Sequence, residues 1–340
     1  MSLKIILAAL TLGLSAGATS ALAADQATID AARKEGELTW YTTEIVNQHV
    51  RPAAAAFEKK YGVKVNYDRA NPTYIELRVI TEANAGKIQA DVVDGTATSV
   101  MLRREGHILQ WVPENNFDKQ FVDPEGYWIT TNAYVLTPGF NTELVPKGTE
   151  PRNYQDLLDP KWKGKMVWNA TPVTSAGPGF VGTVLTSMGE EKGMAYLRAL
   201  AKQNVAAVSS SGRQVLDQVI AGEYSIALQI FNNHAWISAQ KGAPVSWIPM
   251  EPSLGVLSVM SVVKTSAHMN AAKLFVEFLT SEEGQILMRD AGELPVHPKV
   301  PPADPTLRPD GVHFKALFLS PEQIDKSMPS WAKTFNEIFR

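Results

Sequence analysis

The strongest constraint on the fold is a regular alternation of strand-like and helix-like segments in residues 26–106. Residues 37–43, 63–70 and 90–95 are short and apolar or alternate in polarity, which is typical of strands. Each is followed by a helical segment of about ten to fifteen residues, and the helices end at glycines. This β-α-β-α-β-α order predicts a mostly parallel α/β sheet covered by helices.

A second α/β unit interrupts the first one. Residues 126–143 read as a long strand that leaves the first unit, and residues 255–266 read as a strand that returns to it. Two lobes joined by two crossing strands would enclose a cleft, and such a cleft suits hinge closure on a small ligand. Residues 270–292 then read as a helical pair, and 320–340 as a terminal helix.

The predicted domain boundaries follow from this pattern. Lobe 1 is discontinuous and comprises residues 24–134 and 256–300, whereas lobe 2 comprises residues 135–255. Residues 301–340 form a loop and a helix that pack on the lobes. We expect the whole to be a two-lobe fold with two crossing strands and a hinge-closing cleft.

Residues 1–23 have the pattern of a secretory signal peptide. Lys4 precedes an apolar stretch, and Ala21-Leu22-Ala23 forms an A-x-A cleavage site. The apolar stretch is shorter than the roughly 20 residues of a membrane-spanning helix. We therefore expect a periplasmic protein that is secreted through a cleavable signal.

Composition excludes several functional classes. The chain contains no cysteine, which excludes thiol catalysis, thiolate metal sites and a lipoprotein anchor. Its formal net charge is −3 and its lysines and arginines are not clustered, so we expect no nucleic-acid partner. There is no G-x-S-x-G motif, and a secreted hydrolase is only a remote alternative.

Several short motifs, in order along the chain, resemble those of periplasmic solute-binding proteins of ABC importers. The motifs are LTWYTT, ADVVDG, YQDLLDPKWKGKM, AAKLFVEFLTSEEGQ and GELPVHP. The resemblance is to the group that binds ferric iron, thiamine, phosphonates and sugar phosphates. It implies a type II two-lobe fold, no catalysis, and delivery of a small-molecule ligand to an inner-membrane ABC permease. We expect a monomer.

The resemblance leaves ferric iron as an alternative cargo. In iron-binding members, two adjacent tyrosines follow the Asn-Asn of the strand that here ends IFNN. Here those positions are His234 and Ala235, and alanine supplies no donor atom. Glu44, Asp94 and His234 are the remaining candidate metal ligands. We predict no resident cofactor, and iron with a bound anion, or thiamine, remains the alternative ligand.

Hydroxyl groups and backbone N–H groups at predicted helix starts favour a small organic anion, such as a phosphonate, phosphate ester or carboxylate. Arg213 could bind such a group bidentately. Each residue also has a structural interpretation, because Ser and Thr at helix starts mostly cap helices, and Asn232-Asn233 could satisfy strand-end backbone. Most tryptophans and tyrosines nearby would be core residues rather than stacking partners. The predicted ligand-binding residues are Thr42, Thr43, Glu44, Asp94, Thr96, Thr98, Thr174, Ser175, Ala176, Ser211, Arg213, Asn232, Asn233 and His234.

Overall fold

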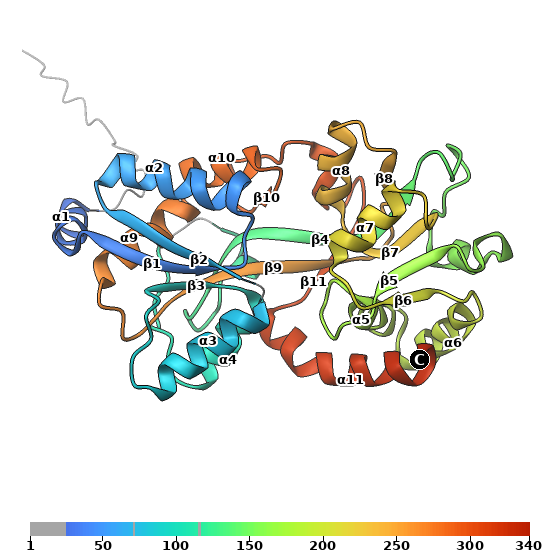
Figure 1. The fold of residues 1–340 in the computed structure, drawn as a ribbon, viewed down its shortest axis with the longest axis horizontal. Helices are drawn as coiled ribbons and strands as arrows, with labels where there is room; N and C mark the ends of the chain where they lie inside the picture. Colours follow the sequence, from blue (N-terminus) through green and yellow to red (C-terminus); the bar gives the residue numbers. More distant parts are fainter. Residues whose placement is uncertain (1–24, 71, 115–116) are drawn as a thin grey trace, which may run out of the picture.

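The computed structural model describes residues 25–70, 72–114 and 117–340, so the predicted signal peptide lies outside the described residues. Its strands form a single mixed sheet with the order β2-β1-β3-β9-β4-β7-β5-β6. Short strands β8 and β10 pair with β4, and β11 pairs with β9. Figure 1 shows one α/β half on each side of the central strands β4 and β9. The α/β fold with two crossing strands is thus confirmed.

The first half contains three parallel strands, each followed by helical structure. α1 (Gln26–Glu35) and α2 (Arg51–Tyr61) both end at glycines in the left-handed conformation, Gly36 with φ 81° and Gly62 with φ 72°. A π-helical turn precedes α2. The remaining elements are β1 (Glu37–Thr42), β2 (Lys64–Arg69), α3 (Pro72–Asn84), β3 (Val92–Asp94) and α4 (Thr96–Arg104).

The second half repeats this arrangement. β5, β6 and β7 are parallel, and β7 lies against the crossing strand β4. The elements are β5 (Met166–Asn169), α5 (Gly177–Met188), α6 (Glu190–Ala201), β6 (Ala206–Val208), α7 (Gly212–Ile220), β7 (Ile226–Phe231), α8 (Asn232–Gln240) and β8 (Val245–Trp247).

The crossing strands β4 (Ile129–Asn141) and β9 (Ser253–Val262) are antiparallel partners along most of their length. The end of β3 aligns with β9 through the pair Asp94↔Met260. The end of β7 aligns with β4 through Leu136↔Phe231, and Leu136 in turn faces Leu254 of β9. The carboxyl ends of β3 and β7 therefore approach the middle of the crossing strands from opposite sides, about 20 Å apart at a rise of ~3.3 Å per residue.

The C-terminal residues connect the two halves. α9 (Met269–Thr280), α10 (Glu282–Asp290) and β10 (Leu294–Pro295) follow β9, and β11 (Ala316–Phe318) leads into α11 (Pro321–Phe339). Figure 1 shows α11 running beneath α5 and α6, with its first turn beside α4. Gly182 of α5 allows this packing, because a Cβ there would lie 2.5 Å from the Trp331 ring.

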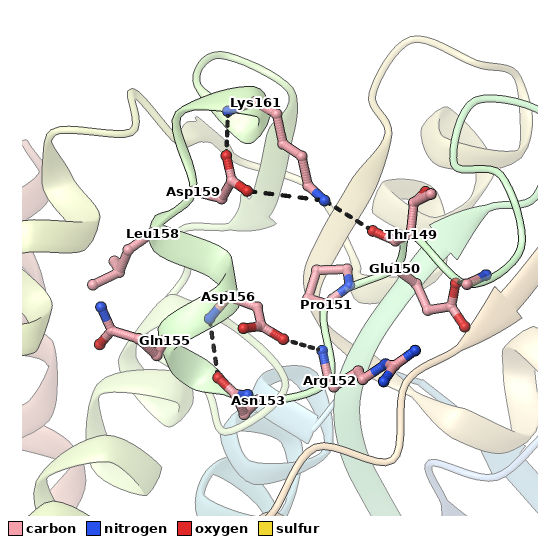
Figure 2. A pocket seen from close by; sticks show the side chains of 11 residues that line it. Thr149, Glu150, Pro151, Arg152, Asn153, Gln155, Asp156, Leu158, Asp159 and Lys161 are labelled. Atoms are coloured by element: carbon pink, nitrogen blue, oxygen red, sulfur yellow. Dashed lines mark hydrogen bonds and ion pairs between the residues drawn. The ribbon is translucent and has the colours of Figure 1, made fainter.

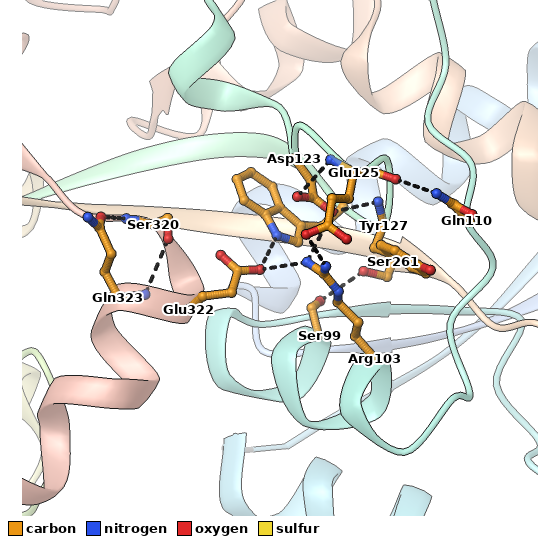
Figure 3. A network of polar contacts seen from close by, with 11 residues as sticks. Ser99, Arg103, Gln110, Asp123, Glu125, Tyr127, Ser261, Ser320, Glu322 and Gln323 are labelled. Carbon is orange, nitrogen blue, oxygen red and sulfur yellow. Dashed lines mark hydrogen bonds and ion pairs between the residues drawn. The ribbon is translucent and has the colours of Figure 1, made fainter.

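The first turn of α11 is tied to the first half through Glu322. Its carboxylate accepts a hydrogen bond of 2.9 Å from the Trp128 indole and lies 3.3 Å from the Arg103 guanidinium. Arg103 also pairs with Asp123 and Glu125, as Figure 3 shows. Since the rest of α11 packs on the second half, the helix spans both lobes.

Two local predictions were wrong. The strand predicted to include Asn232 and Asn233 ends at Phe231, and both asparagines begin α8. The sequence before β5 also reads as a helix, but residues 154–162 form two 3-10 turns, and Pro160 lacks the N–H group that a continuous helix would need. The loop predicted from residue 301 onward contains a 3-10 turn at Pro305–Leu307, and β10 lies just before it. The predicted domain boundaries at 134/135 and 255/256 fall within β4 and β9.

Candidate functional site

The turn after β1 is built around Asp94, which ends β3. One Asp94 oxygen accepts hydrogen bonds from the backbone N–H and the hydroxyl of Thr43, both at 2.8 Å. The other oxygen accepts from the Trp40 indole, also at 2.8 Å. Asp94, Thr42 and Trp40 are completely buried. Thr42, Thr43 and Asp94 therefore lie together at the ends of β1 and β3, and Asp94 fixes the turn that presents Glu44.

Glu44 reaches from this turn to both crossing strands. Its carboxylate accepts a hydrogen bond of 3.1 Å from the Tyr134 hydroxyl on β4 and one of 2.9 Å from the Ser258 hydroxyl on β9. Glu44 is only 3% exposed. The residue thus links the first lobe to the two strands that lead into the second lobe.

A third buried carboxyl group, Glu293, lies just before β10. One of its oxygens accepts a hydrogen bond of 2.9 Å from the Asn233 side chain, and the other has no partner among the described residues. The side-chain oxygen of Asn233 likewise has no partner in the described part of the chain. Glu293 and Asn233 are 1% and 0% exposed. We call Glu44, Asp94 and Glu293 the acid cluster.

Burial raises the pKa of every member of the acid cluster, and repulsion from a second carboxylate adds to this at Glu44 and Glu293. The pKa of Glu44 rises from 4.5 to about 7, first through burial and then through the charge of Asp94. Burial also raises the pKa of Asp94 and, together with the charge of Glu44, raises that of Glu293 well above its usual value. Carboxyl groups with such raised pKa values are typical of functional sites.

The helix starts predicted to bind an anion fall into two kinds. α4 begins after Gly95 and α5 after Ala176, and neither helix has a side-chain cap. Their first N–H groups are available to a ligand. By contrast, Ser211 and Gln214 form a capping box at the start of α7, which satisfies that helix internally.

The loop before α5 carries two hydroxyl groups that could bind a ligand, those of Thr174 and Ser175. Thr174 and Ser175 are half-buried, and neither hydroxyl has a hydrogen-bond partner among the described residues. Gly179 is needed beneath them, because a Cβ at this position would collide with the Thr174 carbonyl group. At α4, the Thr96 hydroxyl donates to the Leu257 carbonyl oxygen at 2.5 Å and Thr98 is wholly buried.

Other predicted residues have partners within the protein. Arg213 is exposed on α7, where it pairs with Asp217 at 2.5 Å and donates to the Ser238 hydroxyl at 2.8 Å. Asn232 is fully buried and donates to the Leu307 carbonyl oxygen at 2.8 Å. His234 is half-buried beside Phe231, and burial lowers its pKa to about 4. Their predicted roles in binding remain predictions.

Two hollows are lined by residues other than the predicted ligand-binding residues. One, of about 690 Å³, is formed by the loop of residues 148–161, and Figure 2 shows its polar lining. The other, of about 250 Å³, lies between Ala133, Pro295 and Phe318. None of the predicted ligand-binding residues lines either hollow. Within the described ranges, no three His, Asp or Glu residues are grouped so that they could hold a metal ion.

Comparison with known proteins assigns the family. Residues 107–316 match the family described as bacterial extracellular solute-binding protein. The chain belongs to this family. Membership of this family makes the chain a binding protein and not an enzyme, as the sequence motifs predicted.

In the part of the chain described, no helix is long and apolar enough to cross a membrane.

Similar proteins have several kinds of ligand. The solute-binding protein is 24% identical over 306 residues to a putative 2-aminoethylphosphonate-binding periplasmic protein of Salmonella typhimurium, covering 87% of this chain and 84% of the relative. Iron-bound HitA of Pseudomonas aeruginosa has a TM-score of 0.72 at 22% identity, over 87% of this chain and 98% of HitA. AfuA of Actinobacillus pleuropneumoniae, with fructose-6-phosphate bound, has a TM-score of 0.70 at 22% identity, over 89% and 98%. These structures confirm the type II periplasmic binding protein fold.

Sequence reasoning missed four polar residues near the acid cluster: Arg69, Tyr134, Ser258 and Glu293. Arg69 ends β2, and its position at a strand end was a usable signal. Tyr134 and Ser258 lie inside the buried strands β4 and β9, whose sequence pattern does not indicate which of their polar side chains reach Glu44. Glu293 lies in the GELPVHP motif, whose acidic residue has no local structural explanation.

Proposed function

We propose that this protein is the periplasmic substrate-binding component of an ABC importer. It captures a small organic anion, namely a phosphonate, phosphate ester or carboxylate, between its lobes and delivers it to an inner-membrane permease. The fold and the family support a binding role. The named specificities of its relatives include a phosphonate and a sugar phosphate.

The observation that carries the anion proposal is the placement of the helix starts without side-chain caps. α4 follows β3, and the register directs β3 and β7 toward the middle of β4 and β9 from opposite sides. α5 follows β5, which is parallel to β7, so its start belongs to the same edge. Helix N-termini carry partial positive charge and unsatisfied N–H groups, which favour an anion.

Ferric iron is the second candidate, supported by the likeness to iron-bound HitA. The donor set does not favour it, because Ala235 stands at one of the positions where the resemblance places tyrosines. Tyr134 adds a phenol near Glu44, but its pKa is raised, mainly by burial, and ferric iron prefers the phenolate.

A thermal-shift screen of the mature protein tests the proposal. Phosphonates, phosphate esters and carboxylates should raise its melting temperature, since ligand at a hundred times its Kd adds about 2.7 kcal/mol to stability. A visible charge-transfer band on addition of ferric salt, with no stabilisation by any organic anion, would establish iron as the cargo instead.

A further inference from the structure

The acid cluster lacks a cation. Three buried carboxyl groups face the crossing strands, and none of them forms an ion pair with a lysine, arginine or histidine among the described residues. Buried carboxylates are strongly disfavoured unless they are paired or hydrogen-bonded. Asp94 accepts three hydrogen bonds, from Trp40 and Thr43. Glu44 accepts two and Glu293 accepts one.

The shortage of donors is concentrated between Glu44 and Glu293. Glu44 accepts one hydrogen bond on each oxygen, although each carboxylate oxygen has room for two. Among the described residues, one oxygen of Glu293 and the amide oxygen of Asn233 beside it have no hydrogen-bond partner. These are acceptor atoms, and Asn233 is uncharged. The missing group is therefore a hydrogen-bond donor, preferably a positively charged one.

An arginine without a partner among the described residues lies within electrostatic reach of Glu44. Arg69 ends β2, is exposed, and has no hydrogen-bond or ion-pair partner for its guanidinium within the described chain. Its charge nevertheless reaches Glu44 and lowers the pKa of that carboxyl group, against the larger effect of burial. The Arg69 guanidinium, which has no partner among the described residues, is therefore close enough to Glu44 to act on its charge, and Glu44 in turn accepts fewer hydrogen bonds than a carboxylate can.

We propose that the ligand is a zwitterion whose ammonium group binds between Glu44, Glu293 and Asn233, while its anionic group lies toward Arg69. This inference rests on the proposed function, because it specifies which organic anions the protein takes. An ammonium group fits the shortage because it offers three N–H donors. A metal ion fits less well, because no three acids or histidines in the described residues are grouped tightly enough to hold one.

Without ligand, a bound proton stands in for the missing cation. Burial and the neighbouring carboxyl groups favour the protonated forms of both Glu44 and Glu293. The groups that face it are Asp94, Glu293, Tyr134 and Arg69. When an ammonium group arrives, the carboxyl group gives up its proton to solvent and the carboxylate pairs with the ammonium. Binding of a zwitterion should therefore release protons near pH 7.

Pairs of ligands that differ only in the amine test the proposal. The probes are 2-aminoethylphosphonate with ethylphosphonate, phosphoethanolamine with ethyl phosphate, and β-alanine with propionate. Isothermal titration calorimetry in two buffers of different ionisation enthalpy measures both the affinity and the protons released. At least one amine-bearing probe should bind at least tenfold more tightly than its amine-free partner, with proton release.

Variants locate the effect. Glu293→Gln keeps the size of the side chain and should weaken the amine-bearing probe at least tenfold, with little effect on an amine-free anion. Arg69→Gln should weaken both. Glu223→Gln, an exposed acid far along the chain, is the matched control and should change neither. Circular dichroism confirms that each variant is folded.

The outcomes separate this inference from the proposed function. If the amine-free partners bind as well as or better than the amine-bearing probes, the zwitterion proposal is wrong and the anion proposal stands. If Glu293→Gln weakens binding of the amine-bearing and the amine-free probe equally, the acid cluster does not recognise the amine and the zwitterion proposal is wrong. If no probe of either kind binds, both proposals fail.

Discussion

Replacing Glu44 by glutamine should stabilise the unliganded protein at alkaline pH. Folding raises the pKa of Glu44 from 4.5 to about 7, mainly through burial. The folded protein therefore binds more protons than the unfolded chain between these pH values, and its stability falls as the pH rises through them. At about 1.4 kcal/mol per pKa unit, the loss is about 3 kcal/mol above pH 7.

Glutamine removes this loss because it is neutral at every pH. Its carbonyl oxygen can accept the Ser258 hydroxyl, and its amide can donate to the Tyr134 hydroxyl oxygen, so both contacts of Glu44 have replacements. We expect Glu44→Gln to raise the melting temperature by about 5 °C at pH 8 and by almost nothing at pH 5.

Differential scanning calorimetry at both pH values, in buffers without organic anions, measures this difference. Glu223→Gln serves as the exposed control and should behave like the unmodified protein throughout. Equal melting-temperature changes for Glu44→Gln at pH 5 and pH 8 would refute the reasoning, because the effect would then come from packing rather than charge.

Three further changes probe the rest of the fold. Gly182→Ala should lower the free energy of unfolding, measured by urea denaturation, by about 1–3 kcal/mol, because the added methyl group meets the Trp331 ring. The control Gly212→Ala, where a Cβ meets only one atom at 3.6 Å, should be neutral or slightly stabilising. Equal effects of the two changes would contradict the close packing of α11 on α5. Glu35→Ala should lower the free energy of unfolding by about 1–2 kcal/mol, because the Glu35 carboxylate accepts hydrogen bonds of 2.7 and 3.2 Å from backbone N–H groups in the first turn of α9. Unchanged stability would argue against that contact. Burial lowers the pKa of His49 from 6.5 to about 4, so the folded protein loses stability as the pH falls below 6.5. His49→Leu should reduce that loss. The same dependence of stability on acidic pH in both proteins would count against a role of His49.

Local patterns were sufficient to predict most of the elements. The glycines after α1 and α2 adopt the left-handed conformation that ends helices, and their positions alone set those boundaries correctly. The long apolar runs of β4 and β9 identified both crossing strands, because strands in the middle of a sheet are buried on both faces. These features depend on neighbours within a few residues.

The residues around Asn232 show where local reasoning ends. A strand that leads into polar residues gives no sign of whether a helix begins at once, and here it does. The partners of Asn232 and Asn233 lie 75 and 60 residues away, at Leu307 and Glu293. Such contacts depend on the path of the chain between α10 and β11, which no local pattern specifies.

The acid cluster was found only in part for the same reason. Glu44 and Asp94 follow strands and were predicted as site residues. Tyr134, which is 90 residues from Glu44 along the chain, enters only because β4 passes the end of β1. The sequence therefore identified the acids of the first lobe, and the crossing strands supplied the groups that change their chemistry.

The position of Glu44 gives a physical reason for binding and lobe closure to be linked. Its two hydrogen-bond partners lie on β4 and β9, the strands that join the lobes. A ligand ammonium that replaces the proton of Glu44 strengthens both bonds, because a carboxylate accepts hydrogen bonds more strongly than a carboxylic acid does. The same ammonium contacts Glu293, which is bonded through Asn233 to the start of α8 in the second lobe. A single charged group can therefore favour the arrangement in which the lobes are held together, and its differential affinity for that arrangement is the only source of energy that closure requires.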